Sequence, residues 1–241
     1  MQVIGHRGAA ALAPENTWAS FDRALSIGVD AIETDVHSTS DGELVLIHDK
    51  NLSRTTDGSG VVHDTPWSVV KEFDAGSWFS ADYAGARVPL LRETLAHYGK
   101  RTHLVLEVKQ RGIELRVLDM VRDMGLLAQV TFSSFFFSIV HNLKTHAPTA
   151  KVGSLTIDAK PETTQRVLDA GLDQICPPAP FLSRELVTAW KAVGLEVRAW
   201  GVKDPDMMRA AIDAGVDGMT VDFPHLLLAA VGRPANFSNH G

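Results

Sequence analysis

The sequence predicts an α/β protein, a single (β/α)8 or TIM barrel with a small insertion after its second strand. Short apolar runs alternate with amphipathic stretches over all 241 residues, a pattern typical of βα units around a parallel sheet. Several amphipathic stretches are followed by a glycine, which can adopt the left-handed cap of a helix. Eight such units in about 250 residues is the usual size of this barrel. The capping glycines are Gly28, Gly125, Gly171, Gly194 and Gly215.

The barrel strands are expected at the apolar runs, taken in chain order. These runs are Val3–Gly5, Ala31–Val36, His103–Val108, Gln129–Phe132, Lys151–Leu155, Gln174–Cys176, Glu196–Trp200 and Gly218–Val221. The helices predicted between them include Glu15–Ile27, Glu114–Met124, Glu162–Ala170, Arg184–Val193 and Pro205–Ala214.

A ninth apolar run, Leu44–Ile47, does not fit the barrel. It begins only about seven residues after the second strand, whereas a parallel crossover needs about a dozen residues or more. We therefore expect it to form a hairpin or a loop extension.

Residues 37–90 are predicted to be an insertion after the second strand. The segment is rich in turn residues and carries aromatic residues that look exposed, namely Trp67, Trp78, Phe79 and Tyr83. A long excursion after a barrel strand is expected at the C-terminal mouth, where barrel active sites lie. We expect residues 1–241 to form one catalytic domain that includes this insertion.

The composition makes several kinds of partner poor candidates. The net charge is −6 and no block of Lys and Arg occurs, which argues against duplex nucleic acid and anionic membrane surfaces. The single cysteine, Cys176, excludes an intrachain disulfide. Because the first residues lack a charged leader and no apolar stretch is long enough to span a membrane, we expect a cytoplasmic enzyme without a stable membrane anchor. A homo-oligomer is compatible with the sequence, but nothing in it requires one.

Charged residues gather at the ends of the first three predicted strands. His6 and Arg7 follow the first strand, and Glu33 and Asp35 lie near the end of the second. Glu107 and Lys109 end the third strand. Residues i and i+2 of a strand point to the same face, so each of the last two pairs faces one way. Burying so many charges together would be costly without a ligand, and a divalent cation with a phosphate would account for all of them.

Glu33, Asp35 and Glu107 are the candidate metal ligands. Carboxylate oxygens suit Mg²⁺ or Ca²⁺, and like charges this close repel unless a cation lies between them. The alternative is a set of solvated charges at the barrel rim, paired with Arg7 and Lys109.

His6 and His48 are the candidate catalytic residues. Either one alone would suggest a structural histidine, but both lie beside a charged residue at a strand end. Together they can act as a general base and a general acid, as phosphodiester cleavage requires. Arg7 and Lys109 are candidate phosphate contacts. Trp200, at the end of the seventh barrel strand, is either a core residue or an apolar platform for the substrate.

These residues stand within an ordered series of motifs that resembles the glycerophosphodiester phosphodiesterase family over nearly the whole chain. The series is His6-Arg7-Gly8-Ala9, Pro14-Glu15-Asn16-Thr17, Phe21, Glu33-Thr34-Asp35-Val36, Thr39-Ser40-Asp41-Gly42, His48-Asp49, Arg54-Thr55-Thr56-Asp57-Gly58-Ser59-Gly60, Gly76-Ser77-Trp78-Phe79, Pro89-Leu90-Leu91, Glu107-Val108-Lys109, Ser133-Ser134-Phe135, Trp200 and Thr220-Val221-Asp222-Phe223-Pro224.

The resemblance implies the same barrel and a divalent metal on Glu33, Asp35 and Glu107. It also implies His6 and His48 as the acid–base pair, with Arg7 and Lys109 on the phosphate. Hydrolysis of glycerophosphodiesters to glycerol 3-phosphate and an alcohol is the activity it implies. One departure bears on the preferred alcohol, because Gly201-Val202-Lys203 follows the tryptophan where the family often has Thr-Val-Asn.

Two other functions are compatible with the sequence. A lysophospholipase D-like enzyme acting on lipids would need an apolar rim, which the aromatic residues of the insertion could supply. A non-catalytic phosphate-binding protein would be expected to lack part of the acid–base or metal set, and here every position is present. The sequence does not decide between water and the glycerol 2-hydroxyl as nucleophile, between Mg²⁺ and Ca²⁺, or which histidine is the acid.

Overall fold

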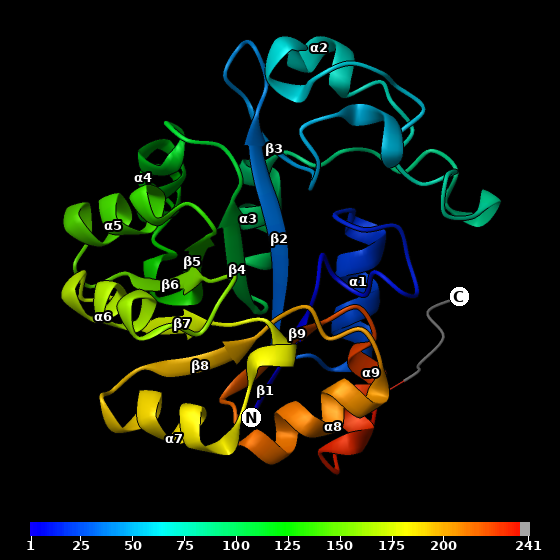
Figure 1. The fold of residues 1–241 in the computed structure, drawn as a ribbon. Helices are drawn as coiled ribbons and strands as arrows, with labels where there is room; N and C mark the ends of the chain where they lie inside the picture. The colour runs from blue at the N-terminus through cyan, green and yellow to red at the C-terminus, as the bar shows by residue number, and fades with distance from the viewer. Residues whose placement is uncertain (237–241) are drawn as a thin grey trace.

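The predicted barrel is confirmed by a computed structural model, which describes residues 1–236. In this part of the chain eight parallel strands form a closed ring, in the order β1-β9-β8-β7-β6-β5-β4-β2 (Figure 1). The ring closes because β1 pairs with β9 on one side and with β2 on the other. Helices surround the ring, so each strand is covered on its outer face.

The strands and helices follow the predicted alternation. The strands are β1 (Gln2–Gly5), β2 (Ala31–Ser38), β3 (Leu44–Leu46), β4 (His103–Val108), β5 (Val130–Ser134), β6 (Lys151–Leu155), β7 (Gln174–Cys176), β8 (Glu196–Ala199) and β9 (Gly218–Val221). The helices are α1 (Trp18–Ile27), α2 (Trp67–Val70), α3 (Leu91–Tyr98), α4 (Glu114–Asp123), α5 (Phe137–His146), α6 (Pro161–Asp169), α7 (Arg184–Ala192), α8 (Pro205–Ala214) and α9 (Pro224–Ala230).

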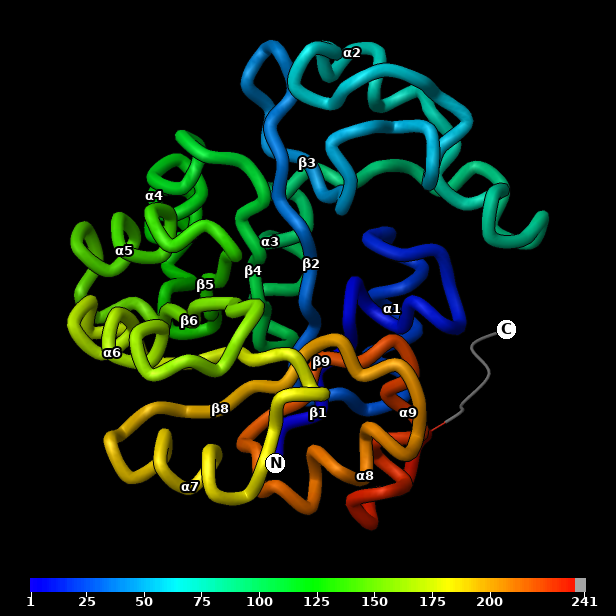
Figure 2. Tube along the Cα trace, viewed as in Figure 1, coloured from blue at the N-terminus to red at the C-terminus, as the bar shows by residue number. Residues whose placement is uncertain are grey.

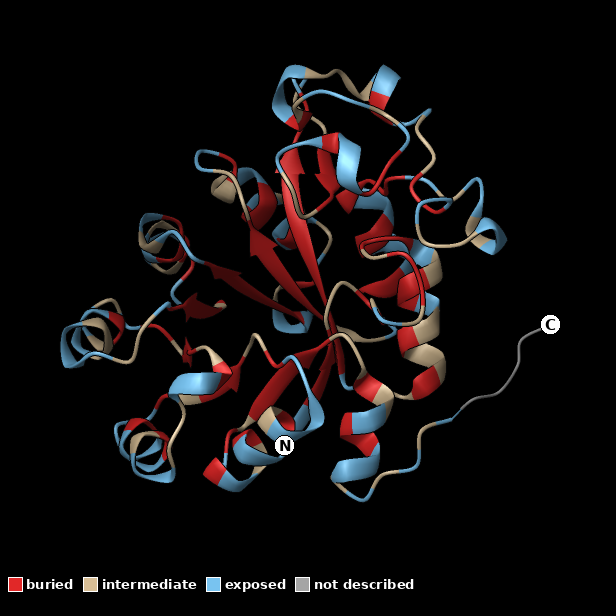
Figure 3. Cartoon of the chain, turned by 45° about the vertical axis from the view of Figure 1, so that its right-hand side comes forward, coloured by how far each residue is buried: buried red, intermediate tan, exposed pale blue. Residues whose placement is uncertain are grey.

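The main apolar core lies between the strands and the helices. Successive residues of a strand point to opposite faces, and Val3, Ile32 and Leu104 belong to this outer core. Their chain neighbours Ile4, Ala31 and Val105 form a separate apolar cluster, which must therefore lie inside the ring. The strands are buried on both faces, whereas the helices expose one face to solvent (Figure 3). Most of the apolar packing is outside the ring, which leaves its interior available for polar side chains.

The excursion after β2 forms a lobe with its own small core. β3 pairs antiparallel with the end of β2, so the exclusion of this run from the barrel was correct. The chain then leaves the upper end of β2 and returns to α3 (Figure 2). Its apolar side chains pack together in a cluster separate from the main core: Val45, Ile47, Leu52, Val62, Val70, Ala75, Val88 and Leu90. β2 runs two residues further than the predicted strand, so the excursion begins at Thr39.

Helix α1 begins three residues later than predicted, at Trp18. Thr17 has extended backbone and its side chain accepts a hydrogen bond from the amide of Ser20, which caps the helix. Asn16 has a positive φ of 57°, which a helix does not allow. Glu15 and Asn16 are thereby kept out of the helix and remain in the loop at the barrel mouth.

In residues 1–236 no helix is both long and apolar enough to cross a membrane.

The loop between β1 and α1 offers a test of local packing. Gly8 and Gly28 have nearly equal φ values of 94° and 95°. A Cβ on Gly8 would lie 2.3 Å from the hydroxyl oxygen of Ser20, whereas a Cβ on Gly28 would meet no atom within 4 Å. Gly28→Ala should therefore lower the free energy of unfolding by about 1–2 kcal/mol through backbone strain alone. Gly8→Ala should cost about 1–3 kcal/mol more because of the overlap. Urea denaturation of both variants checks this, and equal losses would contradict it.

Candidate active site

The sharp turn after β1 places His6 and Arg7 over the mouth of the barrel. Arg7 has a positive φ of 50° and Gly8 follows at 94°. The amide of His6 donates to the carbonyl of Val221 (3.0 Å), which ties the turn to β9. The amide of Arg7 donates to Oε2 of Glu33 (3.0 Å). The turn is therefore fixed to two neighbouring strands, and both side chains are held above the ring.

Glu33, Asp35 and Glu107 meet inside the barrel. Each offers a carboxylate oxygen, and these oxygens all lie within 4.8 Å of one another. β2 and β4 pair with Asp35 opposite Glu107, and the alternation of the strands turns all three side chains inward. All three residues are buried, Glu33 to 2% exposure. Oε1 of Glu33 has no hydrogen-bond partner among the described residues.

Two fixed cations partly neutralise these carboxylates. Nε of Arg7 lies 3.2 Å from Oδ2 of Asp35. Nζ of Lys109 lies 3.1 Å from Oδ1 of Asp35 and 2.5 Å from Oε1 of Glu107. Both cations thus contact Asp35, whereas in residues 1–236 the contacts of Glu33 are the amide of Arg7 and a distant His6 nitrogen, 3.9 Å from its Oε2.

The unequal sharing of these cations separates the pKa values of the three carboxyl groups. Burial tends to raise the pKa of Asp35, but the charges of Lys109 and Arg7 hold it well below its ordinary value. Burial and the charge of Asp35 raise the pKa of Glu33 to about 7. The same two causes raise the pKa of Glu107. A bound divalent cation would reverse this repulsion, so the three residues fit a metal site.

His6 and His48 each face a carboxylate through Nδ1. Nδ1 of His6 lies 2.5 Å from Oδ1 of Asp222, and Nδ1 of His48 lies 2.6 Å from Oδ1 of Asp49. An ionised carboxylate can only accept, so each Nδ1 donates and each Nε2 is left to exchange a proton. Burial opposes the charge of His6, but the hydrogen bond to Asp222 and the charge of Glu33 raise its pKa. Burial and the positive charges of Lys109 and Arg7 lower the pKa of His48.

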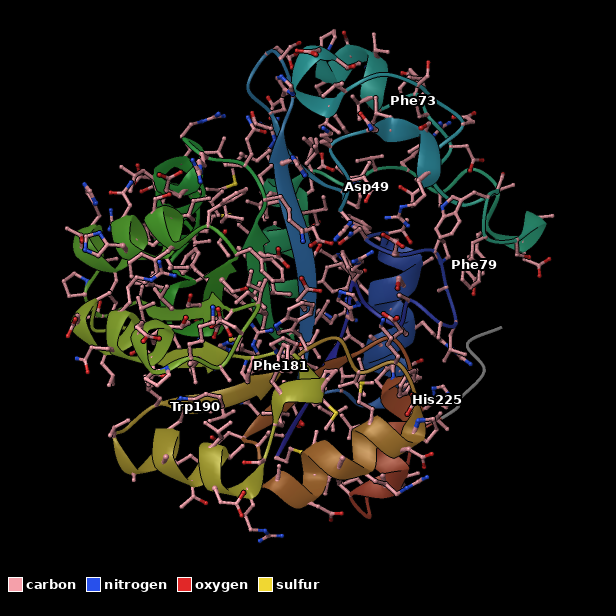
Figure 4. The ribbon with its side chains drawn as sticks, in the orientation of Figure 1. Asp49, Phe73, Phe79, Phe181, Trp190 and His225 are labelled. Carbon is pink, nitrogen blue, oxygen red and sulfur yellow. The ribbon has the colours of Figure 1, made fainter. Side chains whose placement is uncertain are left out.

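A chain of ion pairs joins the excursion to the barrel. Nη1 of Arg7 donates to Oε1 of Glu15 (2.7 Å), which also accepts from Nη2 of Arg54 (2.8 Å). Nε of Arg54 donates to Oδ2 of Asp49 (2.6 Å), and Asp49 holds His48. Asp49 comes from the segment that leads out of β3 (Figure 4). His48 is therefore linked to Arg7 through three charged side chains, those of Asp49, Arg54 and Glu15, although it comes from outside the ring.

Asn16 holds the carboxylate of Asp35 in place. Its Nδ2 donates to Oδ2 of Asp35 (2.9 Å), and its Oδ1 accepts from the hydroxyl of Thr34 (2.7 Å). The positive φ of Asn16 turns its side chain toward β2 rather than into helix α1. Asn16 thereby orients the carboxylate that lies deepest in the site.

Trp200 forms a wall of the mouth opposite β2 and β4. Its Nε1 donates to the carbonyls of Cys176 (3.0 Å) and Thr156 (3.2 Å), so the indole reaches across β7 and β6. The ring meets Phe135 edge to face at 4.9 Å between centroids. This aromatic pair gives the site an apolar side.

Seven of the eight predicted site residues line one cavity of about 370 Å³. They are His6, Arg7, Glu33, His48, Glu107, Lys109 and Trp200. The eighth, Asp35, is fully buried and lies behind them. The structure thus brings the whole predicted set together.

The sequence alone did not predict the site roles of Asp222, Asp49, Glu15, Asn16 and Arg54. The sequence positions of two of these residues could have indicated a role in the site, because Asp222 directly follows the last strand and Asp49 directly follows His48. Their roles depend on partners brought close only by the fold, as for Asp222, which is 216 positions from His6.

The raised pKa of Glu33 predicts how stability depends on pH when no metal is present. The carboxyl ionises near 4.5 when unfolded and near 7 when folded, so stability should fall as the pH rises between these values. Glu33→Gln removes the ionisable carboxyl group, and with it this loss of stability. We expect the variant to gain about 1–3 kcal/mol relative to the original protein between pH 5 and pH 8.

Urea denaturation in a chelator at both pH values measures this effect. Glu93→Gln, at an exposed position on α3, is the matched control and should not change the pH dependence. If Glu33→Gln follows the same pH profile as the original protein, the assignment of a raised pKa to Glu33 is wrong.

Comparison with known proteins identifies the family of this chain. Residues 6–226 match the Glycerophosphoryl diester phosphodiesterase family. A glycerophosphodiester phosphodiesterase of Caldanaerobacter subterraneus is 36% identical over 237 residues, covering 96% of this chain and 98% of that protein.

Two solved structures have a similar fold. The glycerophosphodiester phosphodiesterase of Agrobacterium tumefaciens superimposes with a TM-score of 0.85 at 30% identity, over 95% of this chain and 99% of that one. A phosphodiesterase of Oleispira antarctica, solved with its product sn-glycerol-3-phosphate, gives a TM-score of 0.86 at 30% identity, over 96% and 97% of the two chains. The family match over nearly the whole chain and the shared barrel place this protein in the glycerophosphoryl diester phosphodiesterase family.

Proposed function

We propose that this protein hydrolyses glycerophosphodiesters to glycerol 3-phosphate and an alcohol, with the help of a divalent cation. The observation that carries the proposal is that three buried carboxylates lie together and that two of them, Glu33 and Glu107, line one cavity with the two Asp-bonded histidines, His6 and His48. Relatives of 30% identity or more that are named for this activity support it. We further propose that residues 1–241 work as one catalytic domain, with the excursion supplying His48, and that the enzyme acts in the cytoplasm.

Glu33, Asp35 and Glu107 would hold the cation, which we take to be Mg²⁺ or Ca²⁺. When bound, the cation supplies a positive charge that stabilises the negative charge developing on the phosphate. The unpartnered Oε1 of Glu33 and the proximity of the three oxygens support this assignment.

Arg7 and Lys109 bind the phosphate from the protein side. Both line the cavity, and each is anchored by carboxylates that fix its position before substrate arrives. Such preorganised charges lower the barrier because they need no rearrangement during the reaction.

His6 and His48 transfer the protons. One takes the proton of the attacking oxygen through Nε2, and the other gives a proton to the oxygen of the departing alcohol. The nucleophile is either water or the glycerol 2-hydroxyl. With the hydroxyl, a cyclic phosphate forms first and is then opened by water. Asp222 and Asp49 hold the Nδ1 protons, which fixes the orientation of both rings. Trp200 and Phe135 contact the carbon skeleton of the substrate.

Metal removal tests the proposal directly. We expect glycerol 3-phosphate release from at least one member of a panel of glycerophosphodiesters, loss of activity in excess chelator, and recovery with Mg²⁺ or Ca²⁺. Coupled detection of glycerol 3-phosphate measures this. No release from any substrate would favour a non-catalytic phosphate-binding protein, and full activity in excess chelator would exclude the metal role.

Substitution of the two histidines tests the acid–base pair. His6→Ala and His48→Ala should each lower kcat by at least about 10²-fold, the low end for acid–base catalysis. Each variant should also lose one limb of the bell-shaped pH profile of kcat/KM. Loss of the acidic limb identifies the base, and loss of the alkaline limb identifies the acid.

His63→Ala, at an exposed position in the excursion, is the control and should leave kcat unchanged. A histidine whose replacement leaves turnover nearly normal has no part in the mechanism.

A lysophospholipase D-like activity is the second candidate function, and one observation favours it. Phe135, Phe136, Ile157 and Phe181 are large exposed apolar residues in the segments that follow β5, β6 and β7. Phe181 is labelled in Figure 4. Phe135 lines the cavity, and Phe135 and Ile157 together line a neighbouring pocket, where a lipid tail could lie.

Liposome co-sedimentation with vesicles containing lysophospholipid tests this second function. Binding that Ile157→Ser weakens several-fold would support it. Val193→Ser, which changes an exposed residue at the end of α7, should leave the binding unchanged. If the original protein stays in the supernatant, the lipid function is excluded.

A further inference from the structure

Arg198 is a buried cation on the wall of the cavity that faces the carboxylates. It lies on β8, and its neighbours Val197 and Ala199 belong to the outer core, so its side chain points into the ring. Only 3% of the residue is exposed, yet it lines the cavity. In the closed ring, β8 lies opposite β4, which carries Glu107.

The guanidinium of Arg198 is left largely without partners. Its Nη1 donates to the hydroxyl of Thr220 (2.9 Å), and its other neighbour is the thiol of Cys176, a weak acceptor. Nε and Nη2 are buried and make no hydrogen bond in the described part of the chain. No carboxylate of residues 1–236 forms an ion pair with it.

An unpaired buried cation is costly to the folded protein. Two acidic residues of the barrel strands, Glu107 on β4 and Glu196 on β8, are already paired with Lys109 and Lys151. A guanidinium with two unused donors matches a phosphate or a carboxylate better than a neutral group.

A second cation lies on the same wall. Lys203, in the loop that follows β8, is exposed and lines the same cavity. Arg198 lies on one side of Trp200 along the chain and Lys203 on the other, and all three residues line the cavity. The cavity therefore has an acidic side suited to a metal and is also lined by two further cations and an indole, Arg198, Lys203 and Trp200.

We propose that Arg198, assisted by Lys203, binds a second anionic group of the substrate, a phosphate or a carboxylate. The inference rests on the proposed function and specifies its substrate class, a glycerophosphodiester that carries a negative charge besides the scissile phosphate. The second charge is carried either by the leaving alcohol or by the far end of the glycerol, and the two arms of the experiment below distinguish these sources.

The first arm measures kcat/KM for three glycerophosphodiesters with different alcohols: choline, which is cationic, glycerol, which is neutral, and a glycerol that bears a second phosphodiester. The second arm measures binding of glycerol 3-phosphate and of 3-phosphoglycerate, in which a carboxylate stands in place of the terminal hydroxymethyl group, by calorimetry with Mg²⁺. We expect the anionic compound to be favoured at least about tenfold over its neutral counterpart in one arm. Turnover of the neutral substrate tests the proposed function independently of any preference for the anionic compound.

Arg198→Met is the diagnostic variant. This variant should lose most of the preference for the anionic compound. Its melting temperature should be equal to that of the original protein or higher, because the substitution removes an unpaired buried charge. Lys203→Met, at an exposed position, should reduce the preference by a smaller factor. Arg209→Met, an exposed arginine of α8 that pairs with Asp206, makes the same charge change outside the cavity and should have no effect.

Two results would overturn the proposal. One is the absence of any preference for the anionic compound in both arms. The other is an equal loss by Arg198→Met on anionic and neutral compounds, which would place Arg198 on the scissile phosphate or in the barrel framework. If Arg198→Met does not fold, unchanged preference in Lys203→Met counts against the proposal.

Discussion

Repulsion among three buried carboxylates is the constraint on which the rest of the site depends. Glu33, Asp35 and Glu107 lie within 4.8 Å of one another in the barrel interior, where ionised groups interact strongly. Arg7 and Lys109 are drawn to the most central carboxylate, Asp35, and this leaves Glu33 with a raised pKa. The site is thus arranged to accept a positive charge that the chain itself does not supply.

The same constraint explains the unusual backbone at the mouth. Arg7 and Asn16 both have positive φ values, a conformation that costs about 1–2 kcal/mol for residues other than glycine. In return, the amide of Arg7 reaches Glu33 and the amide of Asn16's side chain reaches Asp35. Strain in one loop is offset by hydrogen bonds to charged groups, which are stronger than those between neutral groups.

The separation of the apolar core from the charged barrel interior allows this concentration of charge. The large apolar core lies outside the ring, between strands and helices, and this core stabilises the fold. The interior needs to contribute little apolar burial, so it can hold carboxylates on one wall and Arg198 on the other. The excursion after β2 has its own apolar cluster and is joined to the mouth by the ion pairs of Arg54 with Glu15 and Asp49.

The sequence by itself determined the barrel, the exclusion of the run at Leu44, and the set of chemical groups at the mouth. These follow from local periodicity, because alternation within a strand decides which residues share a face. Only the tertiary structure decided that Asp35 lies behind the cavity, that Asp222 orients His6, and that Arg198 faces the carboxylates unpaired. Each of these depends on which strands become neighbours or opposites when the ring closes, and no local pattern in the chain contains that information.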